Sequence, residues 1–183
     1  TINVTSRLAI EPGTVVEFEQ DSRLLVTDTG SIWAVGTPEE RIELRGRLNV
    51  TGFWYGICFG TNRHSRLEHV NLLNAGKVWT GTSTVCRAGL SGVTGNGEPV
   101  DIVNTLVAGA QTTGVDATRF TIGEFGGNVF AANLEFGLRV DPGQLYKLDV
   151  TSDYLGSSVG APNTRAYVWV AGIISDTGYR HTW

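Results

Sequence analysis

Acidic residues are the first candidates for chemistry in this chain, and in its second half they include Asp101, Asp116, Asp141, Asp149 and Asp153. A glycoside hydrolase needs two carboxyl groups that face one groove. A lyase needs aspartates clustered around calcium, together with a basic residue that removes a proton. None of these aspartates forms a close pair on one face of a strand, so we expect solvated loop carboxylates.

The histidines His64, His69 and His181 have no cysteine or aspartate at the spacing of metal ligands. The glycine-rich segment 123–128 lacks the Lys-Ser/Thr ending and the following helix of a phosphate-binding loop. The sequence therefore predicts no catalytic residue, no metal site and no cofactor.

Exposed aromatic side chains stack on sugar rings, so we examine whether the aromatic residues of this chain could form a carbohydrate-binding surface. They are scattered along the chain and would line one side of an elongated fold only if its geometry brought them together. The alternative is that Trp54 and Trp169 pack in the core. The candidates are Trp54, Tyr55, Trp79, Tyr146, Tyr154, Tyr167 and Trp169.

Composition narrows the class of protein. The 183 residues are 41% hydrophobic and 17% charged, with a net charge of −4. This is typical of one globular domain, here residues 1–183, and it predicts neither nucleic-acid binding nor a polybasic membrane patch. No apolar run approaches the roughly 20 residues that span a bilayer.

Short β-rich runs separated by Gly, Asn, Asp and Pro recur along the chain, and few of the gaps suit a two-residue hairpin turn. Ser-Arg-Leu opens three of the runs, at Ser6, Ser22 and Ser65. Many short strands without hairpins indicate a solenoid. We expect the segments 77–87 and 152–166 to be loops. Strand starts about 20 residues apart are expected at Leu24, Ile42, Leu67, Leu90 and Val115.

Several segments resemble the parallel β-helix repeat proteins, a pectate-lyase-like superfamily common on bacterial surfaces. The family pattern I-x-P-G-T-x-V-x-F matches residues 10–18, and W-x-G-I-x-F matches residues 54–59. Similar matches occur at residues 30–37, 67–76 and 128–133, but Arg41 stands where the family usually has proline. The resemblance implies a secreted, right-handed, single-stranded parallel β-helix with little or no helix. It does not choose a function.

Alternation within such strands makes further predictions. Ile10, Thr14, Val16, Phe18, Leu24, Val26, Ile57 and Phe59 should point inward. Cys58 should then point outward, and Cys86 should lie on the neighbouring coil, where a disulfide is favoured in a secreted chain. Two free thiols are the alternative. Asn128 and Asn133 are expected at coil corners, where asparagine tolerates left-handed backbone and its amide bonds to another coil.

These features favour a non-enzymatic extracellular structural module. A carbohydrate-binding or adhesin β-helix is the alternative, and a polysaccharide lyase or hydrolase is less favoured. No capping helix is expected at either end, so the chain either stacks end to end on copies of itself, as a filament or surface-fibre subunit, or is a piece of a longer solenoid; a capped monomer is the remaining alternative. Sequons at Asn3 and Asn49 would matter only in a eukaryotic secreted chain. Predicted end-to-end contacts are Ile2, Val4, Tyr167, Trp169, Ile173 and Trp183.

Overall fold

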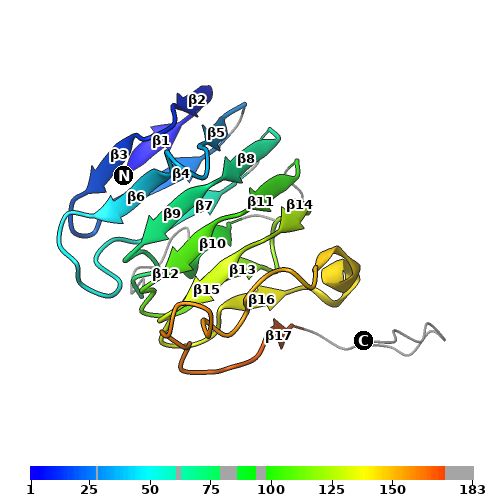
Figure 1. Ribbon diagram of the computed structural model, residues 1–183. Helices are drawn as coiled ribbons and strands as arrows, with labels where there is room; N and C mark the ends of the chain where they lie inside the picture. Colours follow the sequence, from blue (N-terminus) through cyan, green and yellow to red (C-terminus); the bar gives the residue numbers. More distant parts are fainter. Residues whose placement is uncertain (28, 61–62, 79–85, 94–97, 172–183) are drawn as a thin grey trace.

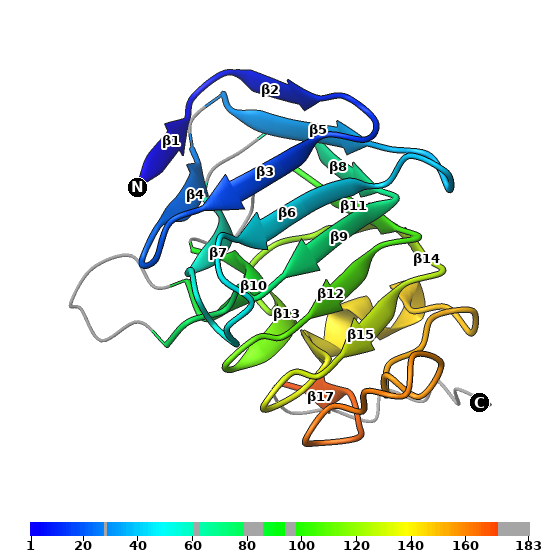
Figure 2. The ribbon, with the colours of Figure 1, turned by 60° about the vertical axis from the view of Figure 1, so that its left-hand side comes forward.

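The computed structural model describes residues 1–27, 29–60, 63–78, 86–93 and 98–171. The chain winds as a solenoid whose strands stack into three parallel sheets (Figure 1). Each complete coil contributes one strand to each sheet before the chain moves down to the next coil (Figure 2). The predicted all-β parallel β-helix with little helix is therefore confirmed.

Seven strands form the first sheet, and five form each of the others. Sheet A consists of β1 (Ile2–Val4), β4 (Arg23–Val26), β7 (Gly56–Phe59), β10 (Ala88–Gly92), β13 (Thr113–Ala117), β16 (Leu138–Val140) and β17 (Trp169–Val170). Sheet B consists of β2 (Arg7–Ile10), β5 (Ser31–Val35), β8 (Ser65–Glu68), β11 (Val100–Val103) and β14 (Ile122–Gly126). Sheet C consists of β3 (Val15–Phe18), β6 (Ile42–Gly46), β9 (Val70–Leu73), β12 (Leu106–Ala108) and β15 (Val129–Ala131).

The core consists of rows of apolar side chains that stack from coil to coil. Alternation sends every second residue of a strand inward, and parallel register places these residues directly above one another. One such row in sheet A is buried along its whole length. It contains Leu24, Ile57, Leu90, Val115 and Leu138.

The residues predicted to point inward fall into a buried group and a partly buried group, according to their position in the chain. Those from Phe18 onward are buried. Ile10, Thr14 and Val16 are only partly buried. They belong to the first coil, and no described strand lies above it.

The length of a coil differs from the prediction. Successive partners of Ile2 along sheet A are Leu24, Ile57, Leu90, Val115 and Leu138, so the coils take 22, 33, 33, 25 and 23 residues. The prediction that Ile42 and Leu67 start equivalent strands is wrong, because Ile42 lies in sheet C and Leu67 in sheet B. The three strands of a coil have similar compositions, so the sequence of a strand does not indicate to which of the three sheets it belongs.

Buried asparagines join neighbouring coils at the corners. Asn128 Oδ1 accepts a hydrogen bond from the Thr105 amide at 3.0 Å, and Asn128 Nδ2 donates to the Ile102 carbonyl at 2.8 Å. Asn133 bonds in the same way to the amide of Ala110 and the carbonyl of Val107. The predicted bonds between coils are confirmed. The left-handed backbone lies instead at neighbouring residues such as Gly127 and Ala132.

The C-terminal ends of sheets B and C are covered. The 3-10 helix η1 (Pro142–Lys147) lies below β14, where Gln144 Oε1 accepts a hydrogen bond from the Ile122 amide at 2.7 Å (Figure 1). Asp141 caps η1, and Pro142 supplies a fixed φ at its first turn. The expectation of no capping helix is therefore wrong at this end. Most of segment 152–166 is irregular, as predicted, and it bonds to the lower edge of β15. Of the other predicted loop, 77–87, residues 79–85 lie outside the described residues.

Candidate functional site

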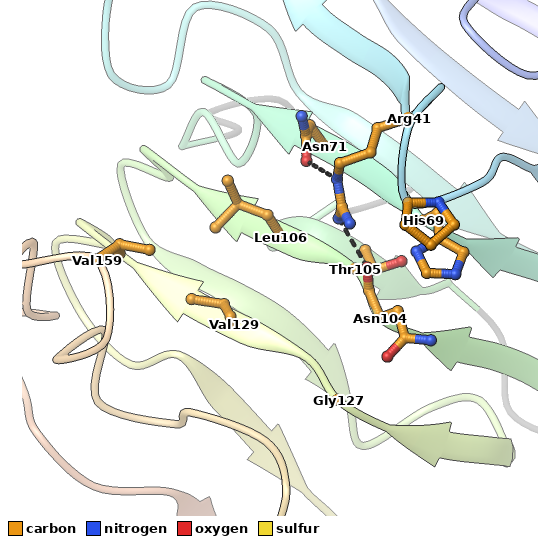
Figure 3. Close-up of a pocket in the computed structure, with 10 residues that line it drawn as sticks. Arg41, His69, Asn71, Asn104, Thr105, Leu106, Gly127, Val129 and Val159 are labelled. Carbon is orange, nitrogen blue, oxygen red and sulfur yellow. Dashed lines mark hydrogen bonds between the residues drawn. The ribbon is translucent and has the colours of Figure 1, made fainter.

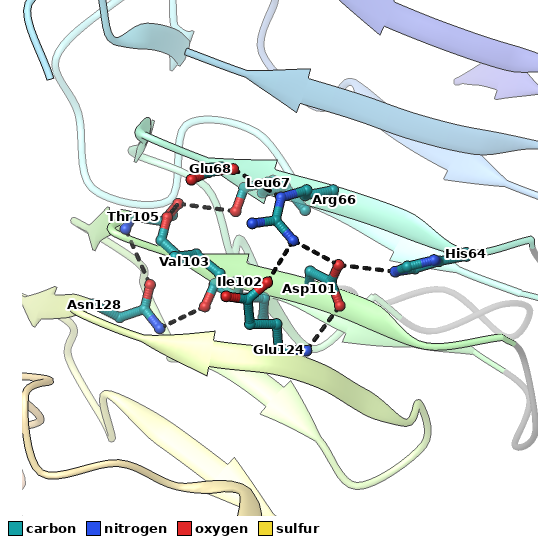
Figure 4. A network of polar contacts seen from close by, with 10 residues as sticks. All are labelled: His64, Arg66, Leu67, Glu68, Asp101, Ile102, Val103, Thr105, Glu124 and Asn128. Carbon is teal, nitrogen blue, oxygen red and sulfur yellow. Dashed lines mark hydrogen bonds and ion pairs between the residues drawn. The ribbon is translucent and has the colours of Figure 1, made fainter. Parts of the chain in front are cut away.

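Charged side chains form a network on the outer face of sheet B (Figure 4). Arg66 on β8 and Asp101 on β11 are register partners, and both point outward because their strand neighbours fill the core. Arg66 Nη1 donates to Asp101 Oδ2 at 3.0 Å and to Glu124 Oε2 at 2.7 Å. Arg66 Nε donates to Glu68 Oε2 at 2.8 Å. The network thus ties three coils together.

Asp101 is held in its ionised form. Burial disfavours the carboxylate, but hydrogen bonds from the Glu124 amide, His64 and Arg66 outweigh that cost and leave the pKa of Asp101 below its ordinary value. The hydrogen bond to Glu68 raises the pKa of Arg66 despite burial. A carboxyl group that is kept ionised in this way has no proton to donate, so it is poorly suited to act as a general acid.

The other candidate aspartates are also engaged in local structure. Asp116 pairs with Arg139 at 3.3 Å, and Asp141 caps η1. Asp149 accepts from side chains and backbone amides of its own turn and of the coil above, and Asp153 accepts from the amides of the following loop. These bonds keep the pKa of both carboxyl groups below the ordinary value, against the opposing effect of burial.

The histidines lie apart. His64 Nε2 is 2.9 Å from Asp101 Oδ2 on sheet B. His69 occupies a corner with φ 49°, and its buried Nδ1 has no hydrogen-bond partner among the described residues. His181 lies outside the described residues. In the part of the chain that the structure describes, no three His, Cys, Asp or Glu side chains are grouped to hold a metal ion.

One serine pattern needs a structural test, since residues 156–160 read Gly-x-Ser-x-Gly. In a nucleophile elbow, this serine occupies a sharp turn between a strand and a helix. Ser158 instead lies in an exposed turn, and its amide donates to Asp153 Oδ2 at 2.6 Å. No strand precedes this turn directly and no helix follows it within the described segment 148–168, so the context of a nucleophile is missing.

The aromatic residues do not share one surface. Trp54 is buried and stacks on Phe18 with ring centroids 3.8 Å apart, so its core position is as expected. Trp169 instead lies 39% exposed on β17, and Trp79 lies outside the described residues. Tyr146 projects from η1 with 71% of its surface exposed. The sequence prediction overlooked Trp33, which lies on the outer face of sheet B with the Arg7 guanidinium 4.7 Å from its ring.

Tyr154 and Tyr167 belong to the C-terminal region. Tyr154 stacks on Phe130 within the cover of the last coils, and Tyr167 packs against Phe136. Tyr55 is partly buried at the start of β7. A continuous row of exposed aromatic rings is therefore not formed by the described members of the set.

The two cysteines lie on adjacent coils. Cys58 is in β7, and Cys86 precedes β10, the next strand of sheet A. The structure joins them in a disulfide, with Cα atoms 5.6 Å apart. Both residues are buried.

The N-terminal end of the solenoid has an apolar depression at its surface. The inward side chains of the first coil form a depression of about 410 Å³, lined mainly by apolar residues. Ile2 is 52% exposed there. Within the described residues, β1, β2 and β3 each pair on one side only, so three strand edges surround the depression. We call this surface the N-terminal face; it includes Ile2, Leu8, Ile10, Glu11, Val16 and Phe18.

The residues predicted for end-to-end contact are separated by the fold. Ile2 lies on the N-terminal face, whereas Val4 is buried. Tyr167 and Trp169 lie at the opposite end and pack against Phe136. Ile173 and Trp183 lie outside the described residues. Both sequon asparagines, Asn3 and Asn49, are exposed.

Comparisons with protein-family models, with curated proteins and with solved structures give no match to this chain. Membership of the pectate-lyase-like superfamily therefore stays a prediction from the sequence motifs. Among the described residues, no helix is both long enough and apolar enough to cross a membrane.

Proposed function

We propose that the chain is a non-enzymatic extracellular structural module that docks a second copy of itself on its N-terminal face. The observation that carries this proposal is the combination of an apolar depression with three unpaired strand edges. Unpaired edges are templates for another strand, and an apolar surface beside them gains free energy when it is covered.

Within the part of the chain that the structure describes, the C-terminal end of the solenoid offers fewer free strand edges than the N-terminal face. Contact between two N-terminal faces is therefore favoured over a head-to-tail filament. η1 covers the last strand of sheet B, and segment 148–166 bonds to the last strand of sheet C. Among the described residues, only sheet A continues at this end, as β17. A contact between two N-terminal faces is isologous and closes at two copies.

Two further observations support the rest of the proposal. The disulfide between Cys58 and Cys86 suits an oxidising compartment outside the cell. Asp101, Asp116, Asp141 and Asp149 are each held by local bonds rather than directed together into a groove. A carbohydrate-binding surface receives less support, because the exposed aromatic side chains are dispersed.

Light scattering during size-exclusion chromatography tests the association. We expect the 19.7 kDa chain to elute with the mass of two copies and Ile2→Asp to elute as a monomer. Val150→Asp is the matched control, because Val150 is fully exposed and lies far from the face. A wild-type monomer at high concentration, or equal masses for wild type and Ile2→Asp, would refute the docking.

Cross-linking distinguishes the two modes of contact. Glu11 is exposed at the N-terminal face, so Glu11→Cys should form a disulfide between two copies across an isologous contact. A head-to-tail filament would leave this cysteine as a free thiol, and the filament would appear as rods in electron micrographs. Filaments with no cross-link would therefore overturn the isologous arrangement.

Assays with pectin, alginate and related polyuronates test the absence of enzyme activity. We expect no bond cleavage above the rate of a heat-denatured control. Reproducible turnover that disappears in Asp101→Asn, while the circular dichroism spectrum stays unchanged, would contradict the proposal.

A further inference from the structure

A pocket of about 370 Å³ opens on the outer face of sheet C, next to the corner shared with sheet B (Figure 3). Arg41 directly precedes β6, and its side chain reaches across β9 toward β12. Its Nε donates to Asn71 Oδ1 at 2.7 Å. Its Nη2 donates to the carbonyls of Val70 at 3.1 Å and Asn104 at 2.7 Å. The guanidinium is thus fixed in position before any ligand arrives.

Arg41 differs from other arginines on the surface in the groups to which it is bonded. Arg45, Arg66 and Arg139 each pair with a carboxylate. All three partners of Arg41 are neutral oxygens, and none of the ion pairs among the described residues includes it. Burial lowers the pKa of Arg41, but an arginine side chain stays protonated in proteins. The pocket therefore contains a partly buried positive charge without a counter-ion.

Donor groups in the pocket remain available. Arg41 Nη1 donates to no described residue, since the hydrogen bonds of this side chain to the described residues use only Nε and Nη2. The side-chain amide nitrogens of Asn71 and Asn104 likewise donate to none of the residues that the structure describes. In Figure 3 the amide nitrogens of Asn71 and Asn104 lie on opposite sides of the Arg41 side chain, so Arg41 Nη1 is the donor that the pocket offers to a small anion.

The rest of the pocket is apolar. Leu106 on β12 and Val129 on β15 are register partners that point outward, and Val159 stands beyond them (Figure 3). Pro38 lines the pocket as well. A ligand that contacts both parts needs an anionic end for Arg41 and a compact apolar body for the valine and leucine side chains. The volume lies near the lower end of the range for small-molecule sites.

We propose that the Arg41 pocket binds a small carboxylate that carries a compact apolar group. The carboxylate accepts a hydrogen bond from Arg41 Nη1, and the apolar group covers Leu106 and Val129. A guanidinium suits this ligand because it donates to carboxylate oxygens with charge-assisted bonds. The pocket lies on the side of the solenoid, so its occupation does not depend on docking at the N-terminal face.

Benzoate is a suitable probe, with benzamide as its neutral counterpart and inorganic phosphate as an anion without an apolar body. Titrations followed by calorimetry and by the NMR signals of arginine Nε and asparagine amides should show saturable binding of benzoate. The shifted signals should be those of Arg41, Asn71 and Asn104. Benzamide and phosphate should bind at least about tenfold more weakly, because each lacks one of the two matched features.

Asn71→Asp is the most informative variant. It keeps an acceptor for Arg41 Nε, so the fold is retained, but it supplies the missing counter-ion. We expect benzoate to bind roughly tenfold more weakly or worse. Asn49→Asp is the control, because it adds the same charge at an exposed position and keeps the acceptor for Asn74.

Three results would overturn the proposal. The first is the absence of saturable benzoate binding to the wild type. The second is equal benzoate affinity in the wild type and in Asn71→Asp. The third is phosphate binding as strong as benzoate binding, which would show that the apolar wall contributes nothing.

Discussion

Replacing Asn128 tests how the solenoid is held together at its corners. The Asn128 side chain is fully buried, and it bonds to the Thr105 amide at 3.0 Å and the Ile102 carbonyl at 2.8 Å. Asn128→Ala leaves one donor and one acceptor of the coil above without partners in the core. An unsatisfied buried group costs about 1–3 kcal/mol, so we expect the free energy of unfolding to fall by about 2–6 kcal/mol.

Urea denaturation followed by tryptophan fluorescence and far-UV circular dichroism measures this loss. Asn49→Ala is the matched control, since Asn49 is exposed and makes a single side-chain bond to Asn74. An exposed substitution of this kind should stay within about 0.5 kcal/mol of the wild type. Equal losses for Asn128→Ala and Asn49→Ala, with unchanged dependence on urea, would show that the corner bonds add nothing to stability.

Two further perturbations follow from named contacts. The disulfide closes a separation of 28 residues, so the Cys58→Ser/Cys86→Ser variant should lose about 3–4 kcal/mol in the chain-entropy model. Alkylation of both thiols in the native, non-reduced chain would contradict the bond itself. Asp101 has a lowered pKa in the folded chain, so its stabilising contribution is present above the ordinary carboxyl pKa and is lost as the pH falls through the folded value. Unfolding free energies measured below about pH 4 should therefore fall more steeply for the wild type than for Asp101→Asn, and parallel curves would refute this reasoning.

The sequence carries enough information for the strands, the inward rows and the corners. Alternation identifies Leu24 and Ile57 as core residues, because a period of two is a local property of a strand. Pro12 and Gly13 mark a turn for equally local reasons, and Gly13 indeed adopts φ 72°. Asn128 and Asn133 stand out because polar amides between apolar runs need partners.

Contacts between coils are harder to predict. Arg66, Asp101 and Glu124 are 35 and 23 residues apart along the chain, and the coil lengths vary between 22 and 33 residues. Without the register, any outward residue of one coil can be aligned with several of the next. Because the loops differ in length, the sequence does not predict which charged side chains lie next to one another. The network on sheet B could therefore not be derived from the spacing of its residues in the sequence.

Arg41, which stands where the β-helix pattern usually has proline, has two roles: it bonds to the backbone at the corner, and it supplies the positive charge of the pocket. A proline there would leave the carbonyls of Val70 and Asn104 without the donors that Arg41 Nη2 supplies. Loss of the arginine would thus disturb the corner and the pocket together, and weaker ligand binding in such a variant would not separate them. Asn71→Asp does separate them, because the bonds of Arg41 stay in place while its unbalanced charge is removed. Retained stability with lost anion affinity would assign the charge to binding and the hydrogen bonds to the fold.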